Sequence, residues 1–289
     1  MLLGHRRGDN NQLLALAEGL GLPFETRSLD YNGLWSFFLS RFPTKPWLLT
    51  RGARSKLVPP WPDLVIGIGR RSVAVSRWIK LRSGGRTKIV RLGNPRARAD
   101  LFDLVITTPQ YPVASGENVL VLPVSMARYA SVSKPNAEEA NWLEALPRPH
   151  ILVSLGGTTR YWQLSDEALV TSLKQLQGRG GSLIVATSPR TPPSAIDAIR
   201  ASGIDCHVVS DEPVRYPILL ADADENFVTA DSVSMISEAV LAGKPVGLIP
   251  VALDEEGERT LGSGGFSSSK RDIRRFWASL QAKGVVGTL

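Results

Sequence analysis

The segment over residues 229–250 restricts the fold of this chain more than any other part. An apolar run that closes at residues 227–228 leads into a polar loop, a helix of small residues follows, and residues 246–249 form a short apolar strand. Gly243 ends the helix and Pro245 prevents it from resuming, because glycine adopts the left-handed cap and proline lacks the N–H that a helix needs. A strand, a helix and a second buried strand in this order predict a βαβ unit with parallel strands.

The amino end of that helix is also a candidate ligand site. A helix that begins at the carboxyl end of a parallel strand presents free N–H groups and a positive dipole, which together bind anions. The side-chain oxygens of Asp231 and Ser232 are expected to cap this helix. Thr229 and Ser234 add hydroxyls that suit phosphates, and Glu238 suits a pair of ribose hydroxyls. An ordinary capped αβ unit explains the same residues, so the segment taken alone favours neither interpretation.

Strands and helices alternate along the whole chain, which predicts an α/β protein with mainly parallel sheets. The pattern restarts after Pro149, so we expect two doubly wound domains with the ligand in the cleft between them, at the carboxyl ends of both sheets. The expected division is a first Rossmann-like domain over 1–133, a linker over 134–149, a second Rossmann-like domain over 150–265, and a flexible loop with a closing helix over 266–289.

The first domain offers a polar segment of its own, Gly8-Asp-Asn-Asn-Gln12, which is expected to form a loop before a helix. Within it, Asp9 is a candidate general base, and a plain helix cap is the simpler alternative. His5 is the only histidine near this loop and is the second candidate catalytic residue. Only residues 1–3 precede the segment, which leaves room for no more than a very short first strand.

Two further strand ends carry candidate residues for binding a phosphate or diphosphate. Gly156-Gly-Thr158 follows the first strand of the second domain, where glycine would let the backbone approach a phosphate; a turn that needs positive φ is the alternative. Arg190 follows the second strand and can bind a diphosphate with two hydrogen bonds, whereas an ordinary surface arginine is the alternative. The expected site for phosphates and a ribose comprises Gly156, Gly157, Thr158, Arg190, Thr229, Asp231, Ser232, Ser234 and Glu238.

Charge is distributed unevenly along the chain. Residues 1–147 hold 20 Lys+Arg against 11 Asp+Glu, whereas residues 148–289 hold 14 against 16. The basic half should attract an anionic partner, and no signature of a nucleic-acid-binding motif is present. Aromatic and basic residues are concentrated over 31–56. This composition fits a segment that binds an anionic membrane surface, and it fits equally well a helix in the core that is flanked by basic residues. The residues assigned to this acceptor or membrane side are Asn10, Gln12, Trp35, Arg41 and Trp47.

Several classes of protein are disfavoured by what the sequence lacks. No apolar run reaches the roughly 18 residues of a membrane helix, and no secretory signal is present, so we expect a cytoplasmic protein that associates peripherally with the inner face of a membrane at most. No His/Cys cluster supports a metal site, and Asp222-Ala-Asp224 should lie at the amino end of its sheet. We therefore expect metal-independent chemistry with no cofactor. The acidic residues 254–258 are expected to form a solvated loop.

The block over residues 229–245 resembles the donor-nucleotide site of GT-B glycosyltransferases, and most of all that of the peptidoglycan N-acetylglucosaminyltransferases. Together with other segments it resembles the "elongated mitochondria" fission-protein family. This resemblance implies a GT-B-like fold with two Rossmann-type domains facing a central cleft. It also implies kinship with plant members that act at the mitochondrial outer surface. The chain departs from the family over residues 214–217, where an Asn-Pro-Tyr is expected. The matching segments are Gly8-Asp-Asn-Asn-Gln12, Thr107-Thr-Pro-Gln110, Gly156-Gly-Thr158, Thr187-Ser-Pro-Arg-Thr191, residues 229–245, and Arg275-Phe-Trp-Ala-Ser-Leu280.

Three functions fit these patterns. The first is inverting sugar transfer from a nucleotide donor to an acceptor, with a lipid-linked acceptor as one candidate; Asp9 would act as base and Arg190 would offset charge on the leaving group. The second is nucleotide-sugar epimerisation, but those enzymes carry two adjacent glutamates where this chain has Ser237 before Glu238. The third is a non-catalytic adaptor at a membrane surface, which leaves the polar residues at the strand ends unexplained. The first function is favoured.

Overall fold

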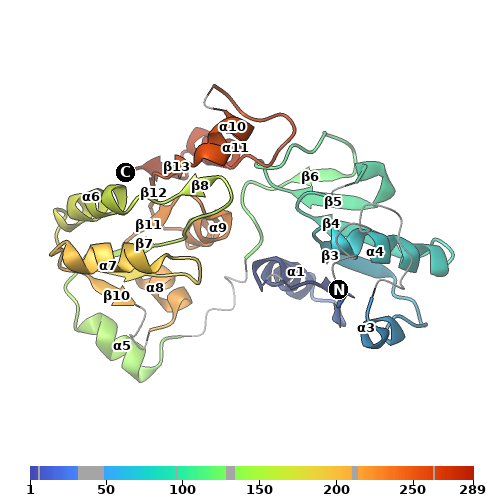
Figure 1. The fold of residues 1–289 in the computed structure, drawn as a ribbon. Helices are drawn as coiled ribbons and strands as arrows, with labels where there is room; N and C mark the ends of the chain where they lie inside the picture. Colours follow the sequence, from blue (N-terminus) through green and yellow to red (C-terminus); the bar gives the residue numbers. More distant parts are fainter. Residues whose placement is uncertain (6, 32–48, 96, 128–133, 210–213, 263) are drawn as a thin grey trace. The chain divides into compact units, whose positions relative to one another are not determined.

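The computed structural model shows two compact units, Met1–Arg128 and Tyr129–Leu289, each built on a parallel sheet with helices packed against it (Figure 1). The α/β class expected from the alternation of strands and helices is confirmed. The structure describes residues 1–5, 7–31, 49–95, 97–127, 134–209, 214–262 and 264–289.

The sheet of the first unit has the strand order β2-β1-β3-β4-β5-β6, with every neighbouring pair parallel. Since β1 lies between β2 and β3, the strand order reverses there, and the carboxyl ends of β1 and β3 form a topological switch point. The elements are β1 Leu2–Leu3, α1 Arg7–Gly19, β2 Arg27–Ser28, α3 Arg51–Ser55, β3 Leu64–Ile68, α4 Arg71–Arg82, β4 Lys88–Leu92, the 3-10 helix η2 Ala99–Leu101, β5 Leu104–Thr107 and β6 Val119–Val121.

Helices cover both faces of this sheet. Leu13 of α1 packs with Ile66 and Leu92 on one face. On the other face, Val75 of α4 packs with Val65. Residue 67 lies on the same face as residue 65, because side chains alternate along a strand, so the α4 face includes Gly67.

The polar segment over residues 8–12 was expected to be a loop, and this expectation was wrong: it forms the first turns of α1. Asn10 accounts for the early start, since its side-chain Oδ1 accepts from the Gly4 N–H at 2.9 Å and its Nδ2 donates to the Gly4 carbonyl at 2.9 Å. Asp9 lies in the first turn, where the helix dipole favours an acid. The short first strand anticipated from the sequence is present as two residues, Leu2–Leu3.

The second unit has the strand order β10-β9-β7-β11-β12-β14, again with every pair parallel. This is the order of a doubly wound dinucleotide-binding sheet, and its switch point lies between β7 and β11. The elements are α5 Ala137–Glu144, β7 His150–Ser154, β8 Trp162–Gln163, α6 Asp166–Gln177, β9 Ser182–Ala186, α7 Pro193–Ala201, β10 His207–Val209, α8 Tyr216–Asp222, β11 Glu225–Thr229, α9 Val233–Leu241, β12 Val246–Ile249, β13 Ala252–Leu253, α10 Glu255–Leu261, α11 Arg274–Ala282 and β14 Gly287–Thr288.

The two faces of this second sheet differ in chemistry. One face packs Val153 and Phe227 against leucines of α6 such as Leu173, in a cluster of buried apolar side chains. The opposite face carries polar groups, among them Ser154, whose hydroxyl lies 3.1 Å from the phenol oxygen of Tyr216 on α8. Buried polar side chains close to a switch point are where a ligand site is expected in a sheet of this order.

The stretch 134–149, treated above as a linker, contains α5, which packs on the second unit. Asn136 and Glu139 form a capping box at its start. The Glu139 carboxylate is fully buried and receives two hydrogen bonds of 2.6 Å from the Arg215 guanidinium, and this pairing lowers the pKa of Glu139 to about 2. Trp142 meets the ring of His207 edge to face at 5.8 Å. These contacts tie α5 to α8 and β10.

The acidic residues 254–258 were expected to form a solvated loop, and this expectation was wrong because they begin helix α10. The Asp254 carboxylate caps the helix by accepting from the Gly257 N–H at 2.6 Å. Three glutamates in the first turn are favoured by the helix dipole rather than disruptive. An acidic run is therefore compatible with a helix when it lies at the amino end.

Candidate functional site

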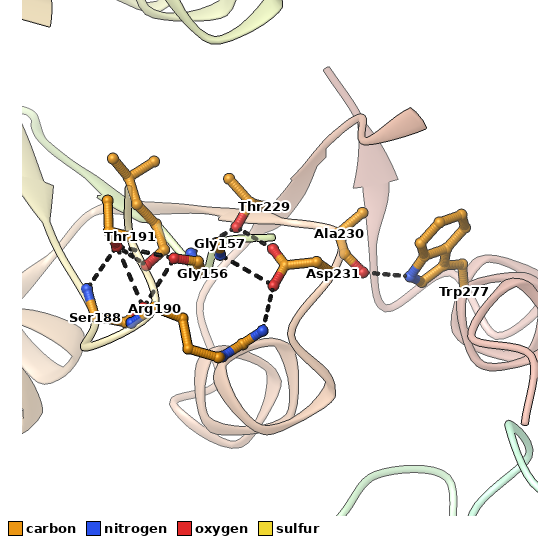
Figure 2. Close-up of polar contacts among 10 residues, drawn as sticks. Gly156, Gly157, Ser188, Arg190, Thr191, Thr229, Ala230, Asp231 and Trp277 are labelled. Atoms are coloured by element: carbon orange, nitrogen blue, oxygen red, sulfur yellow. Dashed lines mark hydrogen bonds and ion pairs between the residues drawn. The ribbon is translucent and has the colours of Figure 1, made fainter. Parts of the chain in front are cut away.

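The carboxyl ends of β7 and β11 meet at the switch point of the second unit and bring together two segments singled out in the sequence (Figure 2). The Gly156 N–H donates to Thr229 Oγ1 at 2.7 Å, and the Gly157 N–H donates to Asp231 Oδ2 at 3.1 Å. The Thr229 hydroxyl in turn donates to Asp231 Oδ1 at 2.7 Å. The Asp231 carboxylate, whose residue is only 3% exposed, therefore joins the two strand ends.

Both glycines are required by close approach rather than by an unusual φ. Neither has a positive φ. A Cβ on Gly156 would overlap the Asp231 carboxylate, and a Cβ on Gly157 would overlap the carbonyl oxygen of Arg190. Their N–H groups donate within the protein to Thr229 and Asp231, so the turn is held by its own polar side chains.

The end of β9 completes this arrangement. Arg190 Nη1 lies 3.1 Å from Asp231 Oδ2. The Ser188 hydroxyl donates to the Gly156 carbonyl at 2.8 Å, and the Thr191 hydroxyl lies 2.8 Å from the same oxygen (Figure 2). Ser188 and Thr191 were not among the predicted site residues, although they belong to the polar segment after this strand. Hydroxyl side chains at a strand end are a signal for this kind of turn.

The polar contacts of the Asp231 carboxyl offset only part of the effect of its burial. Burial raises its pKa, while its contacts with Thr229, Arg190 and Gly157 act in the opposite direction. The Arg190 side chain is 44% exposed, so its charge is shared with solvent and with any ligand at the rim of this site. A guanidinium in this position can bind a second anion without leaving Asp231.

The prediction that Asp231 and Ser232 cap α9 with their side chains was wrong. Ser232 is the N-cap residue by position, but α9 has no side-chain cap hydrogen bond. The Asp231 carboxylate is directed instead to Gly157 and Thr229, because tertiary contacts across the strand ends compete with local capping. The nine-residue α9 thus begins without a side-chain cap, next to Arg190 and with Ser234 exposed in its first turn.

Glu238 lies further along α9 in a half-buried position. Burial raises its pKa to about 7. Burial also raises the pKa of the Tyr216 phenol, and the charge of Glu238 adds to that effect, which places the two groups close enough to interact. Tyr216 belongs to the segment that departs from the expected Asn-Pro-Tyr, and sequence reasoning did not identify it as a site residue.

The closing helix α11 supports the loop between β11 and α9. Trp277 Nε1 donates to the Ala230 carbonyl at 2.8 Å (Figure 2). The Trp277 ring meets Trp162 edge to face at 5.0 Å. Ala230 precedes Asp231 directly, so this indole fixes the backbone that carries the carboxylate. Trp277 lies in one of the segments that carried the family resemblance, but its role depends on a tertiary contact that no local pattern reveals.

One predicted residue of the first unit, Asp9, lies near the switch point between β1 and β3. Asp9 Oδ2 lies 4.0 Å from the place where a Cβ on Gly69, just beyond β3, would stand. His5 is exposed, the Asn10 side chain is hydrogen-bonded to the Gly4 backbone, and Gln12 is partly buried within α1. Trp35, Arg41 and Trp47 lie outside the described residues.

The remaining expectations concern membrane helices, metal ligands and the Asp222-Ala-Asp224 segment. Within the described ranges, every helix is too short or too polar to cross a membrane. The same residues contain no group of three or more His, Cys, Asp or Glu side chains that could hold a metal ion. The Asp224 carboxylate accepts from the N–H of His150 at the start of β7 at 2.8 Å, so the Asp222-Ala-Asp224 segment lies at the amino end of the sheet, as predicted.

The model of the family described as "Mitochondrial fission ELM1" matches residues 7–289. The chain belongs to the mitochondrial fission ELM1 family. The mitochondrial fission protein ELM1 of Arabidopsis thaliana is 27% identical over 265 residues, which cover 81% of this chain and 58% of the plant protein. The chain thus spans less than two thirds of that relative. The uncharacterized protein RP120 of Rickettsia prowazekii (strain Madrid E) is 22% identical over 289 residues, which cover 83% of this chain and 80% of that protein.

Solved structures similar to this ELM1-family chain show its fold. The Staphylococcus aureus MnaA–UDP structure has a TM-score of 0.52 at 15% identity, and the match covers 97% of this chain and 86% of that chain. UDP-GlcNAc 2-epimerase from Neisseria meningitidis bound to UDP-GlcNAc has a TM-score of 0.51 at 12% identity, covering 97% and 89% respectively. The GT-B-like fold and the family expected from the sequence are both confirmed.

Proposed function

We propose that this ELM1-family chain binds a nucleotide sugar at the carboxyl ends of β7 and β11 and transfers the sugar to an acceptor. The observation that carries the proposal is the uncapped start of α9 beside the exposed Arg190, with Glu238 further along the same helix. A helix start with a nearby guanidinium suits a diphosphate, and a carboxylate further along the same helix suits the ribose hydroxyls. UDP and UDP-GlcNAc in the two similar structures support a ligand of this class.

The diphosphate would lie at the first turn of α9. Its oxygens would accept from the backbone N–H groups of that turn and from Arg190, with the exposed Thr158 and Ser234 hydroxyls as further donors. The predicted donor residues divide into two groups in this proposal. Gly156, Gly157, Thr229 and Asp231 bond to one another and shape the turn, whereas the exposed residues contact the ligand.

Glu238 would bind the ribose through its ionised carboxylate. A carboxylate accepts hydrogen bonds from both ribose hydroxyls, and such bonds favour its charged form. Because burial holds the pKa of the free Glu238 near 7, ligand binding should release a proton below that pH. Nucleotide affinity is therefore expected to weaken as the pH falls from 7 to 5.

The transfer step would be inverting and metal-independent. Asp9, with His5 as the second candidate, would remove the proton from an acceptor hydroxyl as its oxygen attacks the anomeric carbon. The bond from that carbon to the diphosphate oxygen breaks, and the nucleoside diphosphate leaves with its new negative charge offset by Arg190. A lipid-linked acceptor is the candidate that would explain the basic first unit.

A membrane-surface adaptor is the second proposal, favoured by the family and by the basic first unit. Epimerisation has less support from the site itself. Ser237 is fully buried and its hydroxyl donates to the Val233 carbonyl at 2.7 Å, so the position before Glu238 points into the protein. Because this position is a serine, the helix has no second carboxylate directly before Glu238.

The test is thermal stabilisation by UDP, GDP, ADP, CMP and UDP-sugars, measured on wild type, Glu238→Ala and the control Glu167→Ala. Glu167 is an exposed glutamate in the first turn of α6. A ligand at about 100 times its dissociation constant adds roughly 2.7 kcal/mol to the free energy of unfolding. One nucleotide should stabilise wild type and Glu167→Ala but not Glu238→Ala. If no nucleotide stabilises wild type, the donor site is wrong and the adaptor, tested by liposome binding, takes its place.

A further inference from the structure

We propose that the first unit carries an anion site of its own, at the turn from β3 into α4, and that this site binds a phosphate or diphosphate group. It lies in a different unit from the proposed donor site and does not depend on it. Three observations support it: a buried arginine without an acidic partner, an uncapped and basic helix start, and an unpartnered buried hydroxyl on the same face of the sheet.

The buried arginine is Arg91 on β4, which is 0% exposed. Its Nη1 donates to Ser72 Oγ and its Nη2 donates to the Gly69 carbonyl, both at 2.6 Å. Its Nε has no hydrogen-bond partner, and no carboxylate of the described residues pairs with it. Burial lowers the pKa of Arg91 to about 10, so it remains a cation at neutral pH. A buried charge without a countercharge is costly, which an anion bound nearby would relieve.

The guanidinium is aimed into the turn between β3 and α4. Gly69 turns the chain there with a φ of +71°, and Gly67 leaves the space that the guanidinium fills, since a Cβ on Gly67 would lie 2.8 Å from Arg91 Nη1. The Gly69 carbonyl belongs to this turn, and the Ser72 hydroxyl belongs to the first turn of α4. Arg91 therefore holds the turn through these hydrogen bonds and places a buried positive charge next to it.

The helix that follows begins without a cap and without acids. Arg70 is the N-cap residue of the twelve-residue α4, with no side-chain cap hydrogen bond and no acidic residue in the first turn. Arg71 comes next, and its guanidinium lies 5.6 Å from the centre of the Tyr31 ring. Two arginines thus occupy a helix start whose N–H groups and dipole already favour an anion.

A third group lies on the same face of the sheet. The register pairs Arg91 with Val105, so Thr107, two residues along β5, lies on the same face of the sheet as Arg91 and Gly67. Thr107 is 3% exposed, and its hydroxyl has no hydrogen-bond partner in the part of the chain that the structure describes. A buried hydroxyl without a partner at the carboxyl end of a strand is a group that a ligand or water would satisfy.

The charge balance selects the class of ligand. Residues 1–128 hold 19 Lys+Arg against 8 Asp+Glu. At the turn itself, the Asp9 carboxylate lies beside Gly69 and is one acidic group, whereas Arg71 and Arg91 supply two cations. Guanidinium groups bind phosphate oxygens through paired hydrogen bonds, and a phosphate or diphosphate carries enough charge to balance this excess. The phosphate could belong to a soluble ester or to a lipid headgroup, which the experiment separates.

The experiment is calorimetric titration of the full chain with inorganic pyrophosphate at constant ionic strength. The variants are Arg71→Gln and Arg91→Met, with Arg82→Gln as the control, because Arg82 lies at the carboxyl end of the same helix. We expect Arg71→Gln and Arg91→Met to weaken binding to the first unit at least tenfold, and Arg82→Gln to leave it unchanged. Arg71→Gln alone decides the matter if Arg91→Met fails to fold.

An added variant, Arg190→Gln, separates this site from the proposed donor site. Pyrophosphate should bind wild type at two sites, and each of Arg71→Gln and Arg190→Gln should remove one. The proposal is overturned if Arg71→Gln leaves both binding events intact, or if Arg82→Gln weakens pyrophosphate binding as much as Arg71→Gln does. If wild type lacks only the binding event that depends on Arg190, the donor site is wrong and the site in the first unit stands. Vesicles of phosphatidylcholine with or without phosphatidic acid then identify the source: binding that needs phosphatidic acid and Arg71 assigns a lipid headgroup, and its absence assigns a soluble phosphate.

Discussion

At the scale of single residues, Glu238 should make stability depend on pH. Its pKa is raised from 4.5 to about 7 in the folded chain, so between these values the folded chain binds a proton that the unfolded chain does not. The free energy of unfolding therefore falls as the pH rises through this window, by up to about 3 kcal/mol at roughly 1.4 kcal/mol per unit. Glu238→Gln cannot ionise and should match wild type near pH 4.5 but exceed it at pH 8.

Chemical denaturation at both pH values measures this difference. The same substitution should abolish stabilisation by the nucleotide, because an amide does not replace a carboxylate that accepts from two hydroxyls. A gain in stability joined to a loss of binding would mark Glu238 as a residue kept for function. An equal stability difference at pH 4.5 and pH 8 would show that the raised pKa is not its cause.

The glycines of the strand-end turn allow a second test at this scale. Gly157→Ala would place a Cβ against the backbone carbonyl of Arg190, which has no freedom to move aside as a flexible side chain would. We expect a loss of about 3 kcal/mol or more in the free energy of unfolding, at the upper end of the cost of overpacking. Gly287→Ala is the matched control, since nothing lies within 4 Å of its Cβ position. Comparable melting temperatures for the two variants would contradict this packing.

At the scale of elements, α11 should act on the site through one indole. Trp277→Phe keeps most of the ring but leaves the buried carbonyl of Ala230 without its donor. The expected cost is about 1–3 kcal/mol in the free energy of unfolding, together with a smaller nucleotide-induced shift, because the loop that carries Asp231 loosens. Trp142→Phe on α5 is the control and should leave the nucleotide-induced shift unchanged. Equal nucleotide-induced shifts in the two variants would show that α11 does not support the site.

The elements that could be predicted from sequence are those with a strong local signal. Buried apolar strands such as β7 and β9, and helices such as α6 with a capping serine at Ser165, follow from hydrophobic pattern and cap chemistry alone. The start of α1 could not be placed, because the bonds between Asn10 and Gly4 decide it. The same limit applies to the site. The segments that meet were identified, but the direction of the Asp231 carboxylate depends on contacts between residues over 70 positions apart.

At the scale of the whole molecule, the position of α5 argues that the second unit is complete from residue 134. The fully buried carboxylate of Glu139 on α5 pairs with Arg215 at the start of α8, whose side chain is 50% exposed, and Leu143 of α5 is also buried. Removing α5 takes away this pairing and exposes the apolar surface that Leu143 covers. A fragment of residues 134–289 should therefore unfold cooperatively and keep the nucleotide-induced shift. A fragment that starts at residue 146 lacks α5 and should be far less stable. Denaturation of both fragments checks this. If the shorter fragment has the same free energy of unfolding, then α5 does not contribute to the stability of the second unit, which begins at β7.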